Sequence, residues 1–141
     1  MRPKKVILCV DDNEQELSVL KFTLATNGYR VLAASNGQEA IAVFSTTPQI
    51  DLILADTNMP QMSGFQLAER LKRMRSYVPM LLLADGQAAG GEIHVADAVM
   101  ARKGCSSLEL LERVKVMSAR KRGPRKGAQR IPQDETLAAA S

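Results

Sequence analysis

Two patterns of apolar positions alternate along most of the chain. Short continuous apolar runs are typical of strands buried on both faces, and segments with apolar residues at helical spacing lie between them. Strands are predicted over residues 6–10, 29–34, 50–56, 80–84 and 98–101, and helices over residues 14–27, 38–44, 65–75 and 106–117. This alternation predicts an α/β fold, a doubly wound parallel sheet with helices on both faces.

Apolar residues recur at helical spacing in the first and last predicted helices. They are Leu17, Leu20, Phe22 and Leu24 in the first helix, and Leu108, Leu111, Val114 and Met117 in the last. Asp12 or Asn13 can cap the start of the first helix, and Gly28 follows its end. These signals predict two amphipathic helices.

Residues 85–97 interrupt the alternation. This segment contains Gly86, Gly90 and Gly91, and each glycine costs about 1 kcal/mol inside a helix. We therefore expect the fourth helix to be short, displaced or missing.

The strand over residues 50–56 ends in an acid and is followed by a loop with marked backbone preferences. Pro60 restricts its own backbone and that of Met59, while Gly64 frees the chain before the next helix. In open α/β sheets, ligands bind beyond the carboxyl ends of the strands. Asp56 therefore lies where chemistry is expected.

A second apolar strand, over residues 6–10, also ends in acids, Asp11 and Asp12. If the two strands are neighbours, three carboxylates converge and repel one another unless a cation lies between them. Carboxylate oxygens without His or Cys favour Mg²⁺. Lys103 follows the last strand and would point a positive charge at the same crevice, which suits a phosphoryl group. This set describes a carboxylate poised as a nucleophile toward phosphorus. The alternative is a set of exposed strand-end acids and a surface lysine.

Composition is that of an ordinary globular domain, with 45% hydrophobic and 24% charged residues among 141. The net charge of +4 comes from the last 23 residues, which carry six Lys and Arg against two Asp and Glu. We therefore expect a domain over residues 1–118 and a basic, flexible tail over residues 119–141. No apolar stretch is long enough to span a membrane, so we expect a cytoplasmic protein without membrane insertion.

The two cysteines have no metal-ligand spacing and form no disulfide framework. Cys9 lies inside a predicted strand and Cys105 in a predicted loop. Cys9 is expected to act as a small apolar residue.

Over residues 4 to 118, the chain resembles the receiver domain of two-component response regulators. The residues that carry the resemblance are Val10-Asp11-Asp12-Asn13, the Asp-x-x-Met-Pro-x-x-x-Gly run from Asp56 to Gly64, Pro79, Lys103, and Leu110 to Val114. The resemblance implies a flavodoxin-like fold, with five parallel strands in the order 2-1-3-4-5.

The resemblance also implies roles for individual residues. Asp56 would be the phosphoacceptor, and Asp12 and Asp56 would ligate Mg²⁺ directly, with Asp11 acting through water. The backbone carbonyl of Asn58 would complete the protein ligands, and Lys103 would contact the phosphoryl group. The implied partners are a sensor histidine kinase or a phosphotransfer protein, and an output protein that the sequence does not name.

Three positions depart from the pattern of the family. Ala84 stands where a Thr or Ser hydroxyl usually bonds the phosphoryl group. Met100 stands where an aromatic residue usually turns inward on activation, and Gly104 replaces the proline that usually follows the lysine. These departures predict complete phosphorylation chemistry except for one hydroxyl, with atypical output switching.

Three alternatives stay open beside a phosphorylated receiver. The chain could be a phosphorylation-independent pseudo-receiver that binds a protein through the surface around residues 85–97. The basic tail could contact nucleic acid, although it contains no aromatic residue for base stacking. A metal-dependent phosphohydrolase is disfavoured because the position two residues after Asp56 is Asn58 rather than a second acid.

Overall fold

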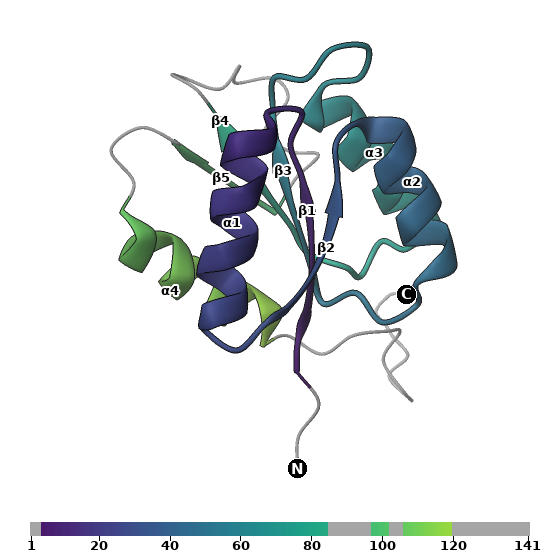
Figure 1. Cartoon of the computed structure of the whole chain (residues 1–141). Coiled ribbons are helices and arrows are strands. Elements are labelled where there is room, and N and C mark those ends of the chain that lie inside the picture. Colours follow the sequence, from purple (N-terminus) through teal and green to yellow (C-terminus); the bar gives the residue numbers. More distant parts are fainter. Residues whose placement is uncertain (1–3, 85–96, 102–105, 120–141) are drawn as a thin grey trace, which may run out of the picture.

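The described part of the chain, residues 4–84, 97–101 and 106–119 of the computed structural model, forms one five-stranded parallel sheet with helices on both faces (Figure 1). The strands are β1 (Val6–Val10), β2 (Arg30–Ala34), β3 (Leu52–Asp56), β4 (Met80–Ala84) and β5 (Ala98–Ala101). The helices are α1 (Glu14–Thr26), α2 (Gly37–Thr46), α3 (Gly64–Met74) and α4 (Ser107–Ser118).

The strand order is β2-β1-β3-β4-β5, and every neighbouring pair is parallel. This confirms the predicted flavodoxin-like, doubly wound sheet. β1 and β3 are neighbours although a strand and two helices separate them in sequence, because β2 lies at the outer side of β1. The ends of β1 and β3 therefore meet at one point of the carboxyl edge.

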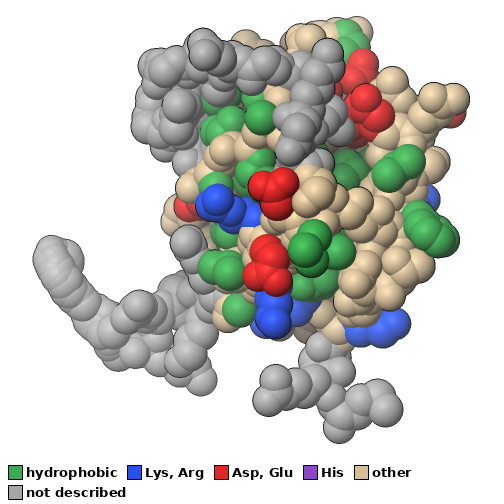
Figure 2. Space-filling model, turned by 90° about the vertical axis from the view of Figure 1, so that its left-hand side faces the viewer, with side chains coloured by type: hydrophobic (Ala, Val, Ile, Leu, Met, Phe, Trp, Pro, Cys, Tyr) green, Lys and Arg blue, Asp and Glu red, His purple; other side chains and the backbone are tan. Residues whose placement is uncertain are grey.

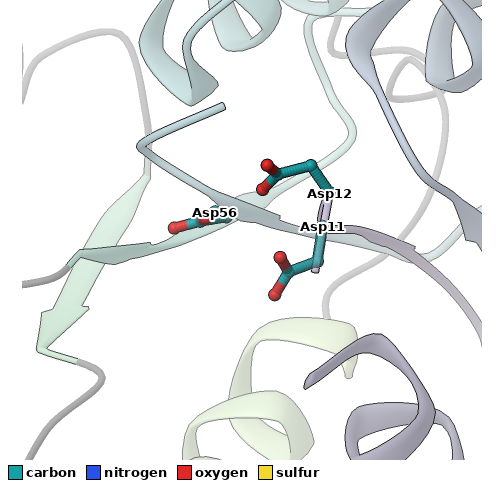
Figure 3. Close-up of side chains that lie close together, drawn as sticks. All are labelled: Asp11, Asp12 and Asp56. Atoms are coloured by element: carbon teal, nitrogen blue, oxygen red, sulfur yellow. The ribbon is translucent and has the colours of Figure 1, made fainter. Parts of the chain in front are cut away.

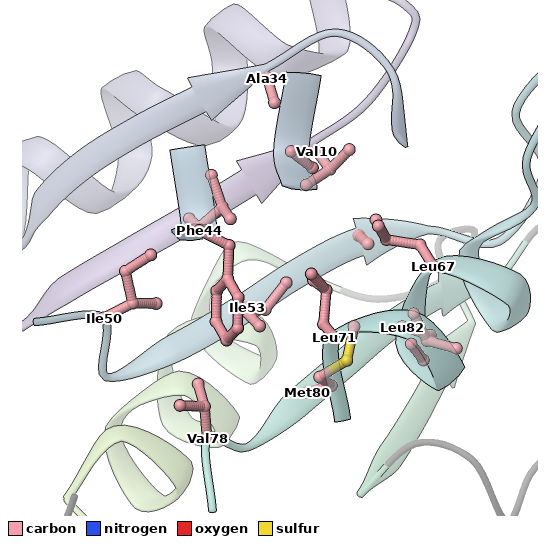
Figure 4. Close-up of a cluster of buried hydrophobic side chains, with 14 of the residues drawn as sticks. Val10, Ala34, Phe44, Ile50, Ile53, Leu67, Leu71, Val78, Met80 and Leu82 are labelled. Atoms are coloured by element: carbon pink, nitrogen blue, oxygen red, sulfur yellow. The ribbon is translucent and has the colours of Figure 1, made fainter. Parts of the chain in front are cut away.

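Two apolar cores cover the two faces of the sheet. On one face, α2 and α3 pack over alternate residues of the central strands, with Phe44, Leu67 and Leu71 fully buried (Figure 4). On the other face, Leu20 and Leu24 of α1 and Val114 of α4 cover the intervening strand residues. Nearly continuous burial of β1, β3 and β4 is typical of a parallel sheet with helices on both sides.

Two residues of the predicted amphipathic helices lie on the solvent side. The side chains of Phe22 in α1 and Leu108 in α4 are 71% and 69% exposed. Phe22 follows Leu20 by only two positions, a rotation of about 200° that places the two side chains on opposite sides of a helix. Phe22 also precedes Leu24 by two positions, so it does not share the buried face of Leu20 and Leu24.

The expected irregularity of the fourth helix falls on residues 85–96, which lie outside the described residues, as does most of the basic tail. The helix labelled α4 is the one predicted over residues 106–117. Its start is closed by a capping box, in which Ser106 and Glu109 each accept a hydrogen bond from the other's backbone N–H.

Cys9 lies in the centre of β1 and is fully buried. Burial, with a smaller contribution from the negative charge of Asp11, raises the pKa of the thiol to about 12. The thiol is therefore protonated at neutral pH and packs as a small apolar side chain, as predicted.

Two aspartates hold the amino ends of β1 and β4 through the same pair of hydrogen bonds. The Asp51 carboxylate accepts a hydrogen bond of 2.7 Å from the Val6 N–H, and the Asp51 N–H donates to the Val6 carbonyl at 2.8 Å. Asp97 repeats this exchange with Met80, at 2.7 and 3.1 Å, and its carboxylate also contacts the Lys72 ammonium at 2.6 Å. Each aspartate thus sets the register of a neighbouring strand before the ladder begins.

We expect Asp51→Ala to destabilise the fold more than Asp97→Ala. The Asp51 side chain is 3% exposed and the Asp97 side chain 28%, so water replaces a lost carboxylate more easily at Asp97 than at Asp51. The expected losses in free energy of unfolding are about 2 kcal/mol for Asp51→Ala and about 1 kcal/mol for Asp97→Ala. Urea unfolding of both variants measures the difference. Equal losses in free energy of unfolding would contradict the expected difference between the two aspartates.

Candidate functional site

Three carboxylates lie together at the carboxyl edge of the sheet. Asp11 and Asp12 follow β1 directly, and Asp56 is the last residue of β3 (Figure 3). One oxygen from each carboxylate lies within 4.8 Å of the other two. Asp11 and Asp56 are buried, whereas Asp12 is exposed. The crossover that makes β1 and β3 neighbours brings these three acids together.

The end of β1 is held by hydrogen bonds on two sides. The Asp11 N–H donates to the carbonyl of Ala34 at the end of β2, at 3.1 Å. The Asp11 carboxylate accepts from the Asn13 N–H at 3.0 Å, and the Asn13 side chain caps α1 by accepting from the Glu16 N–H at 3.0 Å. The amino end of α1 therefore begins beside the acids, where its dipole partly offsets their repulsion.

The end of β3 is held by β4 and by the start of α3. The Thr57 N–H donates to the carbonyl of Leu83 at 3.0 Å, and the Gly64 N–H donates to the carbonyl of Thr57 at 2.9 Å. A Cβ atom on Gly64 would lie 2.3 Å from the carbonyl oxygen of Asp56 and 2.8 Å from the Cα of Thr57. Gly64 does not adopt a positive φ, so this glycine is needed for close approach rather than for the conformational freedom that we expected.

The loop between Asp56 and α3 contains a strained turn that sequence reasoning missed. Gln61 has a φ of 71°, and the Met62 N–H donates to the carbonyl of Pro60 at 2.7 Å. These features define a γ-turn, a rare conformation for a residue with a Cβ atom. Such strain persists only where neighbouring contacts hold the chain in place. The sequence gives no signal for it because Gln is not enriched at positive φ.

The three carboxylates suit a hard divalent cation. Mg²⁺ takes oxygen ligands at about 2.1 Å, so small side-chain rotations or an intervening water suffice to bring donors 4.8 Å apart onto one ion. The donor set contains only carboxylates, which favours Mg²⁺ over the metals that prefer nitrogen or sulfur. The chemistry of the cluster therefore fits the predicted metal.

The other predicted site residues are placed as follows. Asn58 is exposed in the loop after Asp56, and Ala84 is buried at the end of β4. Lys103 and Gly104 lie outside the described residues, so their predicted roles stay predictions.

Met100 is half-buried in β5, directly opposite Leu83 of β4, which itself pairs with Asp56. Its outer side lines a groove against α4 together with Leu108 and Val116. Figure 2 shows this side of the molecule, where hydrophobic, acidic and basic side chains are interspersed. Met100 thus lies between the apolar core and an open surface.

None of the helices in the described part of the chain has the length and apolar character that a membrane span requires.

Comparison with curated proteins finds relatives that are mostly longer. The chain is 35% identical over 79 residues to the alkaline phosphatase synthesis transcriptional regulatory protein PhoP of Bacillus subtilis, and 33% identical over 94 residues to the autoinducer 1 sensor kinase/phosphatase LuxN of Vibrio campbellii. These alignments cover 56% and 67% of this chain but only 32% of PhoP and 11% of LuxN. The chain therefore spans a minor part of either relative.

Several solved structures of similar fold are receiver domains. A CheY-like receiver domain protein from Methanospirillum hungatei aligns with a TM-score of 0.76 and 28% identity, over 82% of this chain and 94% of that one. The response regulator TrrA from Thermotoga maritima, solved in complex with Mg(2+)-BeF, aligns with a TM-score of 0.71 and 30% identity, over 80% and 98% of the two chains. A family model for the response regulator receiver domain matches residues 7–115. Sequence and fold agree, and the chain belongs to the family of response regulator receiver domains.

Proposed function

We propose that this chain is a two-component receiver that accepts a phosphoryl group on Asp56 in a Mg²⁺-dependent reaction. The observation that carries the proposal is the meeting of Asp11, Asp12 and Asp56 at the carboxyl ends of β1 and β3. The donor would be the phosphohistidine of a sensor histidine kinase or of a phosphotransfer protein. The receiver comprises residues 1–118, and residues 119–141 form a basic tail.

In the proposed transfer, Asp56 is the nucleophile. One of its carboxylate oxygens forms a bond to phosphorus while the bond between phosphorus and the donor's imidazole nitrogen breaks. The electron pair of the broken bond stays on that nitrogen, and the product on Asp56 is an acyl phosphate. β3 pairs with β1 on one side and with β4 on the other. The nucleophile is therefore held in position before the donor arrives.

Asp12 and Asp56 are the residues proposed to hold Mg²⁺ directly, with Asp11 acting through water and the Asn58 carbonyl completing the protein ligands. The exposure of Asp12 supports its direct contact with a hydrated ion, and the Asp11 carboxylate already accepts a hydrogen bond from the Asn13 N–H. When bound, the ion offsets the negative charge of the carboxylates and of the phosphoryl oxygens. Lys103 is proposed to contact a phosphoryl oxygen as a point charge.

We propose that output switching is atypical. Ala84 has no hydroxyl with which to bond a phosphoryl group, and Met100 has no aromatic ring to turn inward. Met100 contacts the apolar core on one side and the groove with Leu108 and Val116 on the other. The change that Met100 can still make is a repacking of its flexible thioether side chain.

The proposal is tested with the full chain and acetyl phosphate labelled with ³²P. We expect label to be incorporated at millimolar Mg²⁺, to be absent in excess EDTA, and to be released by hydroxylamine, which cleaves acyl phosphates. No incorporation at millimolar Mg²⁺, or equal incorporation with EDTA, would argue against the proposal.

The substitutions at Ala84 and Met100 favour one second candidate, a pseudo-receiver that binds its partner regardless of phosphorylation. It predicts the same partner affinity for the unmodified wild type, the phosphorylated wild type and Asp56→Asn. A phosphorylated receiver instead predicts an affinity that changes only when the wild type carries the phosphoryl group.

A further inference from the structure

The first residue of α2 has no side chain where the loop after Asp56 packs against it. A Cβ atom on Gly37 would lie 2.6 Å from the Sδ atom of Met62, 3.1 Å from its Cβ and 3.2 Å from its Cγ. Gly37 is buried and does not adopt a positive φ. The glycine therefore supplies space for Met62 rather than backbone freedom.

Turning the Met62 side chain alone would not relieve an added methyl group at Gly37. The sulfur could move to another rotamer, but the Cβ of Met62 is fixed to the loop backbone and is also close. Met62 follows the strained turn at Gln61 and is bonded within it through its own N–H. A methyl group at position 37 would thus displace the loop backbone at its strained point.

The start of α2 is held by three hydrogen bonds, so we expect the loop rather than the helix to move. The Asn36 side chain accepts from the Glu39 N–H at 2.8 Å. The Glu39 carboxylate in turn accepts from the N–H and the hydroxyl of Ser35, at 2.6 and 2.9 Å. These two hydrogen bonds also lower the pKa of Glu39, so its carboxylate is ionised at neutral pH and can accept both.

The contact between Gly37 and Met62 closes a ring of contacts around the acidic cluster. The ring runs from Asp11, through its hydrogen bond to Ala34, along the turn to α2, and across to Met62 in the loop that begins at Asp56. The two halves of the cluster are therefore tied together outside the sheet as well as within it.

We propose that Gly37 and Met62 are positioning residues for the site, and that their contact holds the loop after Asp56 in the conformation that presents the Asn58 carbonyl to a metal ion. This inference rests on the proposed function for its metal. The contact would mechanically link α2 to the loop after Asp56. Neither residue touches the reacting atoms.

The test measures Mg²⁺ binding to the full chain by titration with the metal alone, followed by amide NMR shifts. We expect Gly37→Ala to weaken Mg²⁺ binding about tenfold, the size of effect typical of residues that orient metal ligands. In the double variant Gly37→Ala/Met62→Gly, the added methyl group has neither the sulfur nor the Cβ of residue 62 to meet. Its affinity should lie within about twofold of that of Met62→Gly alone, which is non-additivity through a shared contact.

Gly28→Ala is the matched control. Gly28 has a φ of 93° and no atom within 4 Å of the added methyl group. It lies between the end of α1 and the amino end of β2, at the edge of the sheet opposite the acids, so its substitution strains the backbone away from the site. Gly28→Ala should lower the melting temperature and leave Mg²⁺ affinity within about twofold of wild type, because no site contact is changed.

The other outcomes separate this inference from the proposed function. Unchanged affinity in Gly37→Ala, or a double variant that binds about tenfold more weakly than Met62→Gly alone, would overturn the inference. If the wild type binds no Mg²⁺, the proposed function fails. The link between α2 and the loop after Asp56 is then tested by hydrogen exchange of the Gly64 N–H in metal-free protein. Faster exchange in Gly37→Ala than in Gly28→Ala would support it, and equal exchange would overturn it.

Discussion

We expect Asp56→Asn to abolish incorporation of a phosphoryl group, while the fold is retained. An amide oxygen is a far weaker nucleophile than a carboxylate oxygen, and Asp11 and Asp12 lie at the end of a different strand. The label from ³²P acetyl phosphate at millimolar Mg²⁺ should fall to the level of the EDTA blank. Retention of substantial label in Asp56→Asn would mean that another residue is the acceptor.

Asp51→Asn is the matched control for this prediction. Asp51 is also a buried carboxylate next to β3, but it lies at the amino edge of the sheet and accepts a hydrogen bond from Val6. An asparagine can still accept that bond through its carbonyl oxygen. Asp51→Asn should therefore incorporate as much label as the wild type. This comparison separates loss of the acceptor from loss of any buried charge.

The same substitution at Asp56 should raise stability when no divalent ion is present. Three carboxylates with oxygens within 4.8 Å of one another repel, and removal of one charge lessens the repulsion. The melting temperature of Asp56→Asn in EDTA at low ionic strength should exceed that of the wild type, and added salt should narrow the gap. Millimolar Mg²⁺ should raise the melting temperature of the wild type more than that of the variant.

Most of the fold could be predicted from the sequence because its elements are signalled locally. All nine described elements were predicted with bounds within two residues. The buried strands read as continuous apolar runs, and the strand order followed from the resemblance to receiver domains. The meeting of Asp11, Asp12 and Asp56 was predicted as soon as β1 and β3 were taken as neighbours.

Features that depend on contacts between distant segments could not be predicted in this way. The role of Gly64 is set by the backbone of Asp56, and the role of Gly37 by Met62. The strained turn at Gln61 has no local sequence signal, because the packing of the loop imposes it. Asp51 falls inside the predicted strand over residues 50–56, yet in the structure it precedes β3, is buried and is bonded to Val6. In each case the sequence shows the residue type, but only the fold shows its partner.

We expect Gly64→Ala to have the second largest effect, because the added methyl group meets the backbone of Asp56 and Thr57. The three nearest atoms are the carbonyl oxygen and carbon of Asp56 and the Cα of Thr57, at 2.3, 3.0 and 2.8 Å. No side-chain rotation relieves these contacts, so the end of β3 and the start of α3 must separate. Overpacking of this kind usually costs about 1–3 kcal/mol, and a clash with backbone alone belongs at the upper end, about 3 kcal/mol.

Two measurements distinguish this effect from a general loss of stability. Gly28→Ala carries the same change at a position where φ is 93° and space is open, so it should cost only about 1–2 kcal/mol in urea unfolding. In Gly64→Ala, the hydrogen bond from residue 64 to the Thr57 carbonyl should lengthen, and the Asp56 backbone should move with it. We therefore expect label incorporation to fall at least tenfold in folded Gly64→Ala, in line with a reacting group displaced by a fraction of an ångström. Incorporation at the wild-type level in this variant would show that the close approach of Gly64 shapes the loop without placing the acceptor.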